Sequence, residues 1–524
     1  MTQSTDTDSS RLNQTHRTLI RESVPTKQYR IITLLSARQL LVYVCMLLIF
    51  AGAAQPITDT DFWWHLRTGQ HIVKTKSIPH ADIFSTIAFG KEWVAHEWLA
   101  EVVTYSIFRM LGLGGVIVVF SLILTTAFWI TYERCRKRTG HPYFAVFAVL
   151  LGAVASISTW GVRPHIISLL FASIFISFLD RYSRREEMAS IWWLAPLMVL
   201  WANMHAGYVL GLALIALTIV GLSVNRFLVP SDRQINDWRR VKLLCWLLIV
   251  CAALVMVNPN GARMYSYPFE TFRSPAMMRY IEEWKSPNFH EARFQGLALL
   301  LLATFCALAL SKKRARPSEL LFVAFGAWAT LRSARNVWFF ALVAIPQLAE
   351  HSWIWVTSYG RWRWLTVAEK RDHSGTYSFK LIINVALLML CTTLVILGVQ
   401  RAIAKQPAID AQEFPVAAID FLRSQKLARP IFNEYDWGGY LIWTLYPEYR
   451  VYIDGRADVY GDQMVEEFLR AHDGKPGWRE LLERDGIHTV LIRPDIPLAS
   501  LLRIDTAWQK VFEDKQAVIF VRCL

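Results

Sequence analysis

Cysteine is scarce in this sequence, and no two cysteines have the spacing of a zinc site. Five of the seven lie inside apolar segments, one lies in a basic loop, and only Cys523 belongs to the polar C-terminal part. A single thiol forms no internal disulfide there. Residues 1–38 contain no apolar core of the kind found in a cleavable signal peptide, and no internal repeat is evident. These absences exclude a cysteine-ligated zinc module and a disulfide-bonded C-terminal domain.

Hydrophobic residues, by contrast, are abundant. They make up 54% of the 524 residues, and the mean hydropathy is +0.28. Such a composition is too apolar for a soluble protein of several domains and is typical of a polytopic membrane protein. The net charge of +14 comes mostly from short loops between apolar runs, where Lys and Arg set membrane topology. We therefore expect contact with membrane lipids and no nucleic-acid partner.

Eleven apolar stretches approach the length that crosses a bilayer. They are residues 39–56, 114–133, 143–161, 164–180, 190–205, 207–224, 241–257, 295–311, 318–334, 336–350 and 379–400. A further stretch, 98–112, is ambiguous. The basic clusters all fall on the inner side only if 98–112 lies in the membrane interface instead of spanning the bilayer. The sequence therefore predicts a mainly α, polytopic transmembrane helical bundle with a cytoplasmic N-terminus and an external C-terminus.

This topology divides the chain into three parts. We expect a basic cytoplasmic tail at 1–38, a transmembrane domain at 39–400 with a long external loop at 57–113, and a small external α/β domain at 401–524. Hydrophobic patterning within the last part predicts helices at 413–425 and 462–485, strands at 430–433, 451–455 and 489–493, and a hairpin at 509–522. The tryptophans expected at the membrane surface are Trp63, Trp64, Trp93 and Trp98.

The strongest motif directly follows the first span, at residues 58–69. Its carboxylates Asp59 and Asp61 can ligate a divalent cation, or one of them can act as a general base. Helix capping by one aspartate is the alternative. Capping, however, requires neither a second aspartate nor the following His65, so we favour function.

Further along the same loop, His96 and Glu97 form a second polar pair. Such a pair can orient a base, bind a metal or contact sugar hydroxyls. Alternatively, Glu97 only begins the interfacial helix, where the helix dipole favours a carboxylate. The sequence does not decide between these interpretations.

Basic side chains gather at two external helix ends. Arg163 and His165 flank Pro164, while Arg332 and Arg335 end a later span. Arginine binds phosphate bidentately and stays charged. Snorkelling toward lipid headgroups is the alternative, but it explains lone arginines better than three at two external loops. A phosphate site is the favoured interpretation.

The remaining candidates carry weaker signals. Asn203 and His205 lie in a tight turn between spans, where polar pairs are more often structural. Asp436 and Asp454 belong to C-terminal segments whose acids and aromatics suit carbohydrate contact, although the neighbouring glycines also fit a simple turn into a helix. The stretch 282–287 fits a solvated surface at least as well as the lining of a cleft.

These features resemble the GT-C superfamily of integral membrane glycosyltransferases. A basic tail, a first span and a long external loop match its layout over roughly residues 1–400. The motif Asp59-Thr-Asp-Phe-Trp-Trp-His65 stands where the superfamily places catalytic or metal-binding acids. Phe432-Asn-Glu-Tyr-Asp-Trp-Gly-Gly-Tyr440 is similar to the Trp-Trp-Asp-Tyr-Gly signature of oligosaccharyltransferase catalytic subunits. The tryptophan follows the aspartate here, however, so peptide-sequon recognition is not implied.

The whole chain looks most like a bacterial branch near the protein-mannosyltransferase and aminoarabinose-transferase groups. The resemblance implies an inner-membrane enzyme that moves a sugar from a polyprenyl-phosphate carrier to a glycan, lipid or protein acceptor on the external face. Asp61, with Asp59 second, would deprotonate or orient the acceptor hydroxyl, and Arg163, Arg332 and Arg335 would hold the departing phosphate. A divalent metal at the two aspartates is the cofactor that this interpretation allows.

Two other classes stay open. A transporter or flippase of envelope lipids or glycans also has many spans, but it usually shows internal repeats and broken helices near mid-membrane. Here the polar residues collect at one face. A non-catalytic envelope assembly protein would need no acid cluster, because its external domain would perform its function.

Overall fold

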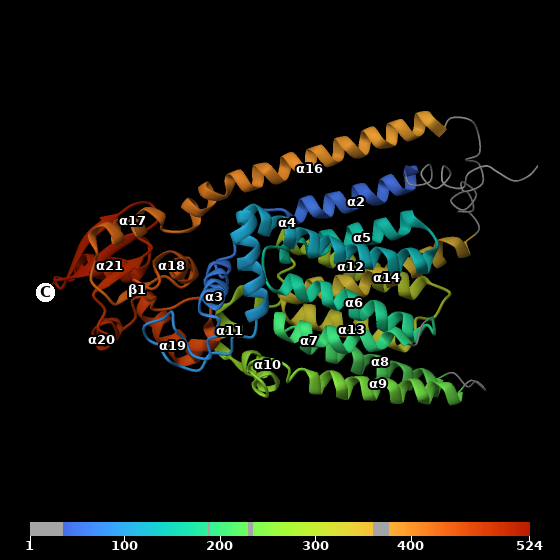
Figure 1. Ribbon diagram of the computed structural model, residues 1–524, viewed down its shortest axis with the longest axis horizontal. Coiled ribbons are helices and arrows are strands. Elements are labelled where there is room, and N and C mark those ends of the chain that lie inside the picture. Colours follow the sequence, from blue (N-terminus) through green and yellow to red (C-terminus); the bar gives the residue numbers. More distant parts are fainter. Residues whose placement is uncertain (1–34, 187–188, 229–233, 360–376, 524) are drawn as a thin grey trace, which may run out of the picture.

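The computed structural model describes residues 35–186, 189–228, 234–359 and 377–523. Its larger part is a bundle of apolar helices lying side by side (Figure 1). These helices are α2 (Ala37–Ala53), α4 (Trp98–Thr139), α5 (Pro142–Ser156), α6 (His165–Ser183), α7 (Leu194–Met204), α8 (Tyr208–Leu228), α9 (Gln234–Leu254), α12 (Gln295–Leu310), α13 (Pro317–Arg332), α14 (Val337–Ser358) and α16 (Tyr377–Glu413). Within the described residues, seven helices are long and apolar enough to cross a membrane.

Each of the eleven predicted stretches coincides with a helix of this bundle or with the second half of α4. The helical prediction is therefore confirmed, while the number of crossings stays a prediction, because some of these helices are shorter than a typical span. The basic tail up to residue 34 lies outside the described residues.

The ambiguous stretch 98–112 forms the first half of α4. A glycine separates the two halves, because Gly112 has a φ of 67° and a ψ of −170°, outside the helical region. Such a backbone favours glycine over any residue with a Cβ. The first half consequently runs across the end of the bundle, and the second half runs along it (Figure 1).

The helix α3 (Phe62–Thr75) packs against this first half of α4. A Cβ at Gly69 would lie 2.1 Å from the carbonyl oxygen of Glu101. Glycine is therefore required here for close approach of the two backbones. The contact fixes the start of α4 beside the loop that carries Asp59 and Asp61.

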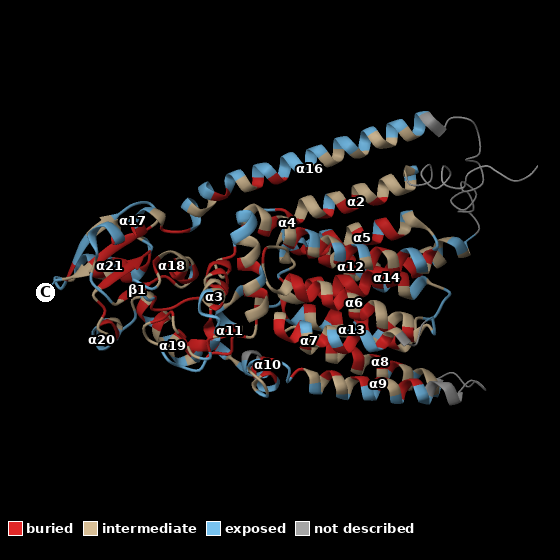
Figure 2. Cartoon of the chain, in the orientation of Figure 1, coloured by how far each residue is buried: buried red, intermediate tan, exposed pale blue. Residues whose placement is uncertain are grey.

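The C-terminal part is a small mixed α/β unit around a four-stranded sheet of order β1-β2-β4-β3. Its strands are β1 (Ile431–Asn433), β2 (Thr489–Ile492), β3 (Trp508–Glu513) and β4 (Val518–Arg522), and its helices are α17 (Val416–Gln425), α18 (Gly438–Leu445), α19 (Ala457–His472), α20 (Trp478–Arg484) and α21 (Pro497–Ile504). β1 and β2 are parallel, and the other pairs are antiparallel. The helices bury the interior of this sheet (Figure 2). The predicted hairpin is present as β3 and β4.

The predicted strand at 451–455 is wrong. Val451 forms one bridge with the loop, since its N–H donates to the Phe84 carbonyl at 3.1 Å. The Tyr452 N–H instead donates to the side chain of Asn433 at 2.7 Å. The backbone of the segment is therefore satisfied by a side chain and a loop, and it adds no strand to the sheet.

Two further boundaries differ from expectation. The single helix predicted at 462–485 is two helices, α19 and α20, separated by Gly474 and Gly477, which have φ values of 64° and 97°. Moreover, α16 continues through residue 400 to Glu413. The proposed domain boundary thus falls within a helix, and the division into domains stays a prediction.

The C-terminal unit covers the same end of the bundle as α3 (Figure 1). Trp63 contacts Tyr440 of α18 with ring centres 5.1 Å apart, and a Cβ at Gly439 would lie 2.4 Å from the Thr60 carbonyl oxygen. Trp63, Trp64 and Trp93 are buried inside the protein. The expectation that they lie at the membrane surface is therefore wrong, because the C-terminal unit covers them.

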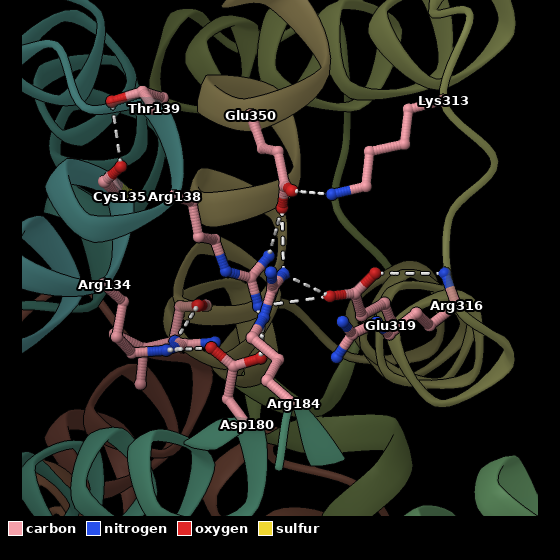
Figure 3. A network of polar contacts seen from close by, with 11 residues as sticks. Arg134, Cys135, Arg138, Thr139, Asp180, Arg184, Lys313, Arg316, Glu319 and Glu350 are labelled. Carbon is pink, nitrogen blue, oxygen red and sulfur yellow. Dashed lines mark hydrogen bonds and ion pairs between the residues drawn. The ribbon is translucent and has the colours of Figure 1, made fainter. Parts of the chain in front are cut away.

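A network of charged residues joins the helices at the opposite end of the bundle (Figure 3). Arg138 on α4 lies 2.6 Å from Asp180, 3.4 Å from Glu319 and 3.3 Å from Glu350. Arg184, just after α6, contacts the same three acids at 3.0, 2.6 and 2.9 Å. The network therefore ties α4, α6, α13 and α14 together at that end.

Candidate active site

One large cavity, of about 1750 Å³, lies where the bundle, α3 and the C-terminal unit meet. Most of the side chains that the sequence singled out line it. They are Asp59, Asp61, His65, His96, Glu97, Arg163, His165, His205, Arg332, Arg335 and Asp436. The structure thus brings together residues from distant segments of the chain, whereas Asn203 and Asp454 lie outside the lining.

Arg163 joins two carboxylates in this cavity. Its Nε lies 2.8 Å from Asp59 Oδ2, and its Nη2 donates to Asp59 Oδ1 at 3.0 Å. Its Nη1 donates to Glu283 at 2.8 Å. A bidentate guanidinium fixes a carboxylate strongly. Asp59 therefore has both oxygens engaged and is poorly placed to ligate a metal or to accept a proton.

Asp61 directly precedes α3, but its side chain makes no capping hydrogen bond to that helix. Its Oδ1 accepts a hydrogen bond from Trp64 Nε1 at 3.1 Å. Burial and the neighbouring Asp59 carboxylate raise the pKa of Asp61 to about 7. The capping explanation thus fails for Asp61, and its carboxyl titrates in the range suited to a general base at neutral pH.

The C-terminal unit touches this carboxyl directly. A Cβ at Gly455 would lie 1.7 Å from Asp61 Oδ1, so the carboxylate rests against the glycine backbone. The sequence suggested only a turn for this glycine. Its role is visible only once the loop and the C-terminal unit are packed together.

A buried group of His65, Glu97 and Glu101 lies beside the two aspartates. His65 Nδ1 is 3.0 Å from Glu101 Oε1 and 3.3 Å from Glu97 Oε2. These three side chains could hold a metal ion. Burial alone would lower the pKa of His65, but the two glutamates raise it to about 9. Glu101 was not among the predicted site residues, although its position one helical turn after Glu97 was a usable signal.

Two more histidines surround Glu97. His96 Nε2 and His205 Nε2 lie 3.4 and 3.3 Å from Glu97 Oε1. The Gly207 N–H donates to His205 Nδ1 at 2.8 Å, so His205 Nε2 carries the proton that points toward Glu97. Burial lowers the pKa of His205 to about 3, which keeps this imidazole neutral.

Asn203, which lies in the same predicted turn as His205, has a structural role. Asn203 accepts a hydrogen bond from Trp98 Nε1 at 3.0 Å and donates to the Val199 and Val257 carbonyls at 2.8 and 2.7 Å. All these contacts are within the protein. Asn203 therefore holds the start of α4 against α7 and the end of α9.

The basic side chains differ in how far they are already paired. Arg335 lies 3.7 Å from Glu283 and over the Trp284 ring, with 4.6 Å to its centre. His165 Nε2 donates to the Thr159 carbonyl at 2.8 Å. Arg332, at the end of α13, is exposed in the cavity lining and forms no hydrogen bond or ion pair with the described residues. It is thus the guanidinium most available to an anion.

Residues 282–286 of the stretch 282–287 line this cavity, so the stretch is the wall of a cleft and not simply a solvated surface. Through Glu283 it contributes the acid that links Arg163 to Arg335. Glu283 was not among the predicted site residues.

In the C-terminal unit, Asp454 has a structural role, because it holds the side chain of Arg456. It is fully buried and binds Arg456 through both oxygens, at 2.8 and 2.7 Å. Arg456 also lies 2.8 Å from Asp82 and over the Trp93 ring. Of the two interpretations that the sequence left open for this segment, carbohydrate contact does not fit Asp454, because its oxygens face this arginine inside the protein. Asp436, in contrast, is exposed in the cavity lining.

Comparison of the sequence with protein-family models and with curated proteins found no match. Solved structures do resemble it. Archaeal oligosaccharyltransferase AglB from Archaeoglobus fulgidus, in complex with an inhibitory peptide and a dolichol-phosphate, superposes with a TM-score of 0.57 at 12% identity over 89% of this chain and 70% of that chain. The apo form of the Archaeoglobus fulgidus oligosaccharyltransferase gives 0.53 at 12% identity over 92% and 74%. ArnT from Cupriavidus metallidurans bound to undecaprenyl phosphate gives 0.45 at 13% identity over 95% and 98%.

At such low identity the likeness concerns the fold. This protein is a multi-pass membrane protein with the GT-C fold of membrane glycosyltransferases.

Proposed function

We propose that the protein transfers a sugar from a polyprenyl-phosphate carrier to an acceptor hydroxyl or amide at the membrane surface. The observation that carries this proposal is one cavity that holds a carboxyl titrating near neutrality, an unpaired arginine and an apolar wall. The archaeal neighbour with the same fold was solved with a dolichol-phosphate, which belongs to this class of lipid phosphate.

The chemistry assigns separate roles to the two ends of the cavity. The Asp61 carboxylate takes the proton from the acceptor, whose heteroatom attacks the anomeric carbon of the sugar. The bond between that carbon and the phosphate oxygen breaks, and negative charge collects on the departing lipid phosphate. Arg332, and more weakly the already paired Arg335 and Arg163, stabilises that charge.

The apolar wall suits the lipid tail of the donor. Val209 and Leu210 of α8 and Phe325 and Trp328 of α13 line the cavity. Trp328 is also 60% exposed. A prenyl chain held between α8 and α13 would remain in contact with lipid while its phosphate reaches Arg332.

The acceptor would enter from the side of the C-terminal unit. Glu434, Asp436, Asp458 and His472 line the cavity there, and such groups hydrogen-bond hydroxyls. This surface suits a glycan, a lipid headgroup or a protein side chain as the acceptor.

The proposal includes an orientation in a bacterial inner membrane, with the cavity on the external face and the N-terminus in the cytoplasm. The basic loops carry this part of the argument. Single cysteines placed at the exposed positions Lys137 and Asp420, in a chain freed of its own reactive thiols, should react with an impermeant maleimide from opposite sides. Labelling of both from one side would overturn this orientation.

The decisive experiment follows release of labelled sugar from its lipid carrier by the purified, membrane-reconstituted protein. The wild type should transfer sugar from at least one member of a panel of polyprenyl-phosphate donors. Asp61→Asn should lower the rate by about a hundredfold to ten-thousandfold, the typical contribution of a general base. Asp420→Asn, at an exposed carboxylate on α17 outside the lining, should leave the rate unchanged. A wild-type rate in Asp61→Asn would remove Asp61 from the mechanism.

A further inference from the structure

We propose that His65, Glu97 and Glu101 form a binding site for one divalent transition-metal ion, of the zinc or manganese type. The site joins α3 to the start of α4 and lines the cavity beside Asp61. One imidazole and two carboxylates are ligands that these ions accept. The site is separate from the Asp59 and Asp61 pair, which the sequence had suggested as metal ligands.

The spacing of the three ligand atoms fits coordination around a single ion. Metal–ligand distances of about 2.0–2.2 Å place neighbouring ligand atoms roughly 3.0–3.5 Å apart. His65 Nδ1 lies 3.0 Å from Glu101 Oε1 and 3.3 Å from Glu97 Oε2. All three groups offer atoms within 4.8 Å of one another, so small rotations of the side chains suffice to bind an ion.

An unsatisfied oxygen points to a missing partner at this place. Glu101 is 2% exposed, and its Oε2 is buried without a hydrogen-bond donor in the described structure. A buried carboxylate oxygen without a partner is costly. A divalent ion held by both oxygens of Glu101 would supply a ligand bond for Oε2 and positive charge beside two adjacent buried glutamates.

The surroundings orient the ligands in the way that metal sites require. His205, fixed by the Gly207 N–H, directs its Nε2 toward Glu97 Oε1 at 3.3 Å. The second oxygen of Glu97 is left for the ion. Hydrogen bonds of this kind from outside the ligand set raise metal affinity. Close packing of Gly69 against the Glu101 carbonyl further fixes the distance between the two helices.

The Asp59 and Asp61 pair is a weaker candidate for the ion. Both oxygens of Asp59 are already bound by Arg163, and a guanidinium beside a carboxylate disfavours a second cation. The competing explanation for the His65 group is an ion pair between a protonated imidazole and the glutamates. The two explanations differ in whether the protein takes up metal.

The test uses full-length protein purified through a histidine-free tag, stripped with a chelator and then exposed to zinc or manganese chloride. Elemental analysis after desalting should find about one ion per wild-type chain, and titration should give the affinity. His65→Gln and Glu101→Gln should each weaken binding by more than about tenfold, because loss of a ligand exceeds the effect of an outer hydrogen bond. His71→Gln, on the same helix, and Glu92→Gln, in the same loop, should bind as the wild type does.

Thermal unfolding gives a second readout that does not depend on sugar transfer. Saturating metal should raise the melting temperature of the wild type and of both control variants, since a ligand specific to the folded state stabilises it. It should not raise that of Glu101→Gln. Wild-type protein that takes up no more zinc or manganese than His65→Gln does would overturn the site and leave the ion pair. Failure of the sugar-transfer assay would not affect this result, because metal uptake is measured directly.

Discussion

Two clusters of buried charge lie at opposite ends of the helix bundle, and they are built differently. At the far end, Arg138 and Arg184 share Asp180, Glu319 and Glu350 between them (Figure 3). At the cavity end, charged groups border about 1750 Å³ of space, and Arg332 has no partner among the described residues. In the far-end cluster each acid pairs with several cationic side chains. In the cavity cluster some charged side chains, Arg332 among them, are available to bind a ligand.

The difference helps to separate structural from functional charge. A transporter must open a path through both ends of its bundle, whereas a transferase needs access at one membrane face. The far-end network joins four helices through paired charges and, within the described residues, borders no comparable cavity lining. The comparison gives opposite expectations for mutations at the two ends.

The largest effect on stability is expected at the far end. Asp180→Asn leaves Arg134, Arg138 and Arg184 short of a counterion and should lower the free energy of unfolding by about 3–5 kcal/mol. The rate of sugar transfer per folded molecule should not change. Unfolding in denaturing detergent and the transfer assay measure the two quantities separately. Glu133→Gln, which breaks an exposed pair with Arg136 at the same end, should cost no more than about 1 kcal/mol. Loss of activity in folded Asp180→Asn would contradict this division of roles.

The next effect concerns the donor phosphate. Arg332→Ala should lower kcat/KM for the lipid-linked donor by about tenfold to 150-fold, the equivalent of the 1.5–3 kcal/mol of a hydrogen bond to a charged group. Stability should hardly change, because the side chain is exposed and unpaired. Arg401→Ala, at an exposed arginine on α16, is the matched control. Equal effects of the two substitutions would place the phosphate elsewhere.

A smaller effect should follow from crowding Asp61. In Gly455→Ala the new methyl group would overlap Asp61 Oδ1, so the carboxylate or the glycine segment must move. We expect a destabilisation of about 1–3 kcal/mol, as for other overpacked sites, together with a lower kcat. Gly398→Ala, where a Cβ meets open space on α16, should affect neither. An unchanged kcat in Gly455→Ala would show that the position of Asp61 tolerates displacement.

The smallest effect is a shift in pH dependence. Because burial and Asp59 raise the pKa of Asp61 to about 7, and the base must be ionised, kcat/KM should fall about tenfold for each pH unit below that value. Asp59→Asn removes one cause of the raised pKa and frees Arg163 to favour the ionised form, so the midpoint should move to lower pH. The measurement is a pH–rate profile at subsaturating donor. A midpoint that moves upward in Asp59→Asn would contradict the assigned electrostatics.

The sequence by itself determined the membrane class, the helical bundle and the short C-terminal strands. Runs of apolar residues and alternating patterns involve neighbouring positions, so they can be recognised in the sequence without knowledge of the fold. The GT-C fold was implied by the resemblance of this layout, and of the loop motif at Asp59 and Asp61, to that superfamily. The two acids and the three arginines that the sequence singled out line one cavity, because all of them lie at or near helix ends at the same end of the bundle.

The tertiary structure alone decided which of these side chains are free to bind a ligand and which are already paired within the protein. Asp59 pairs with Arg163, which is distant in the sequence. Asp454 pairs with Arg456, which is near in the sequence but faces it only inside the packed core. No local pattern marks Gly455 as the surface on which Asp61 rests. The strand predicted at 451–455 failed for the same reason, since the side chain of Asn433 satisfied its backbone. Local patterning sets which elements form, whereas pairing of buried charge depends on distances that exist only after those elements have packed.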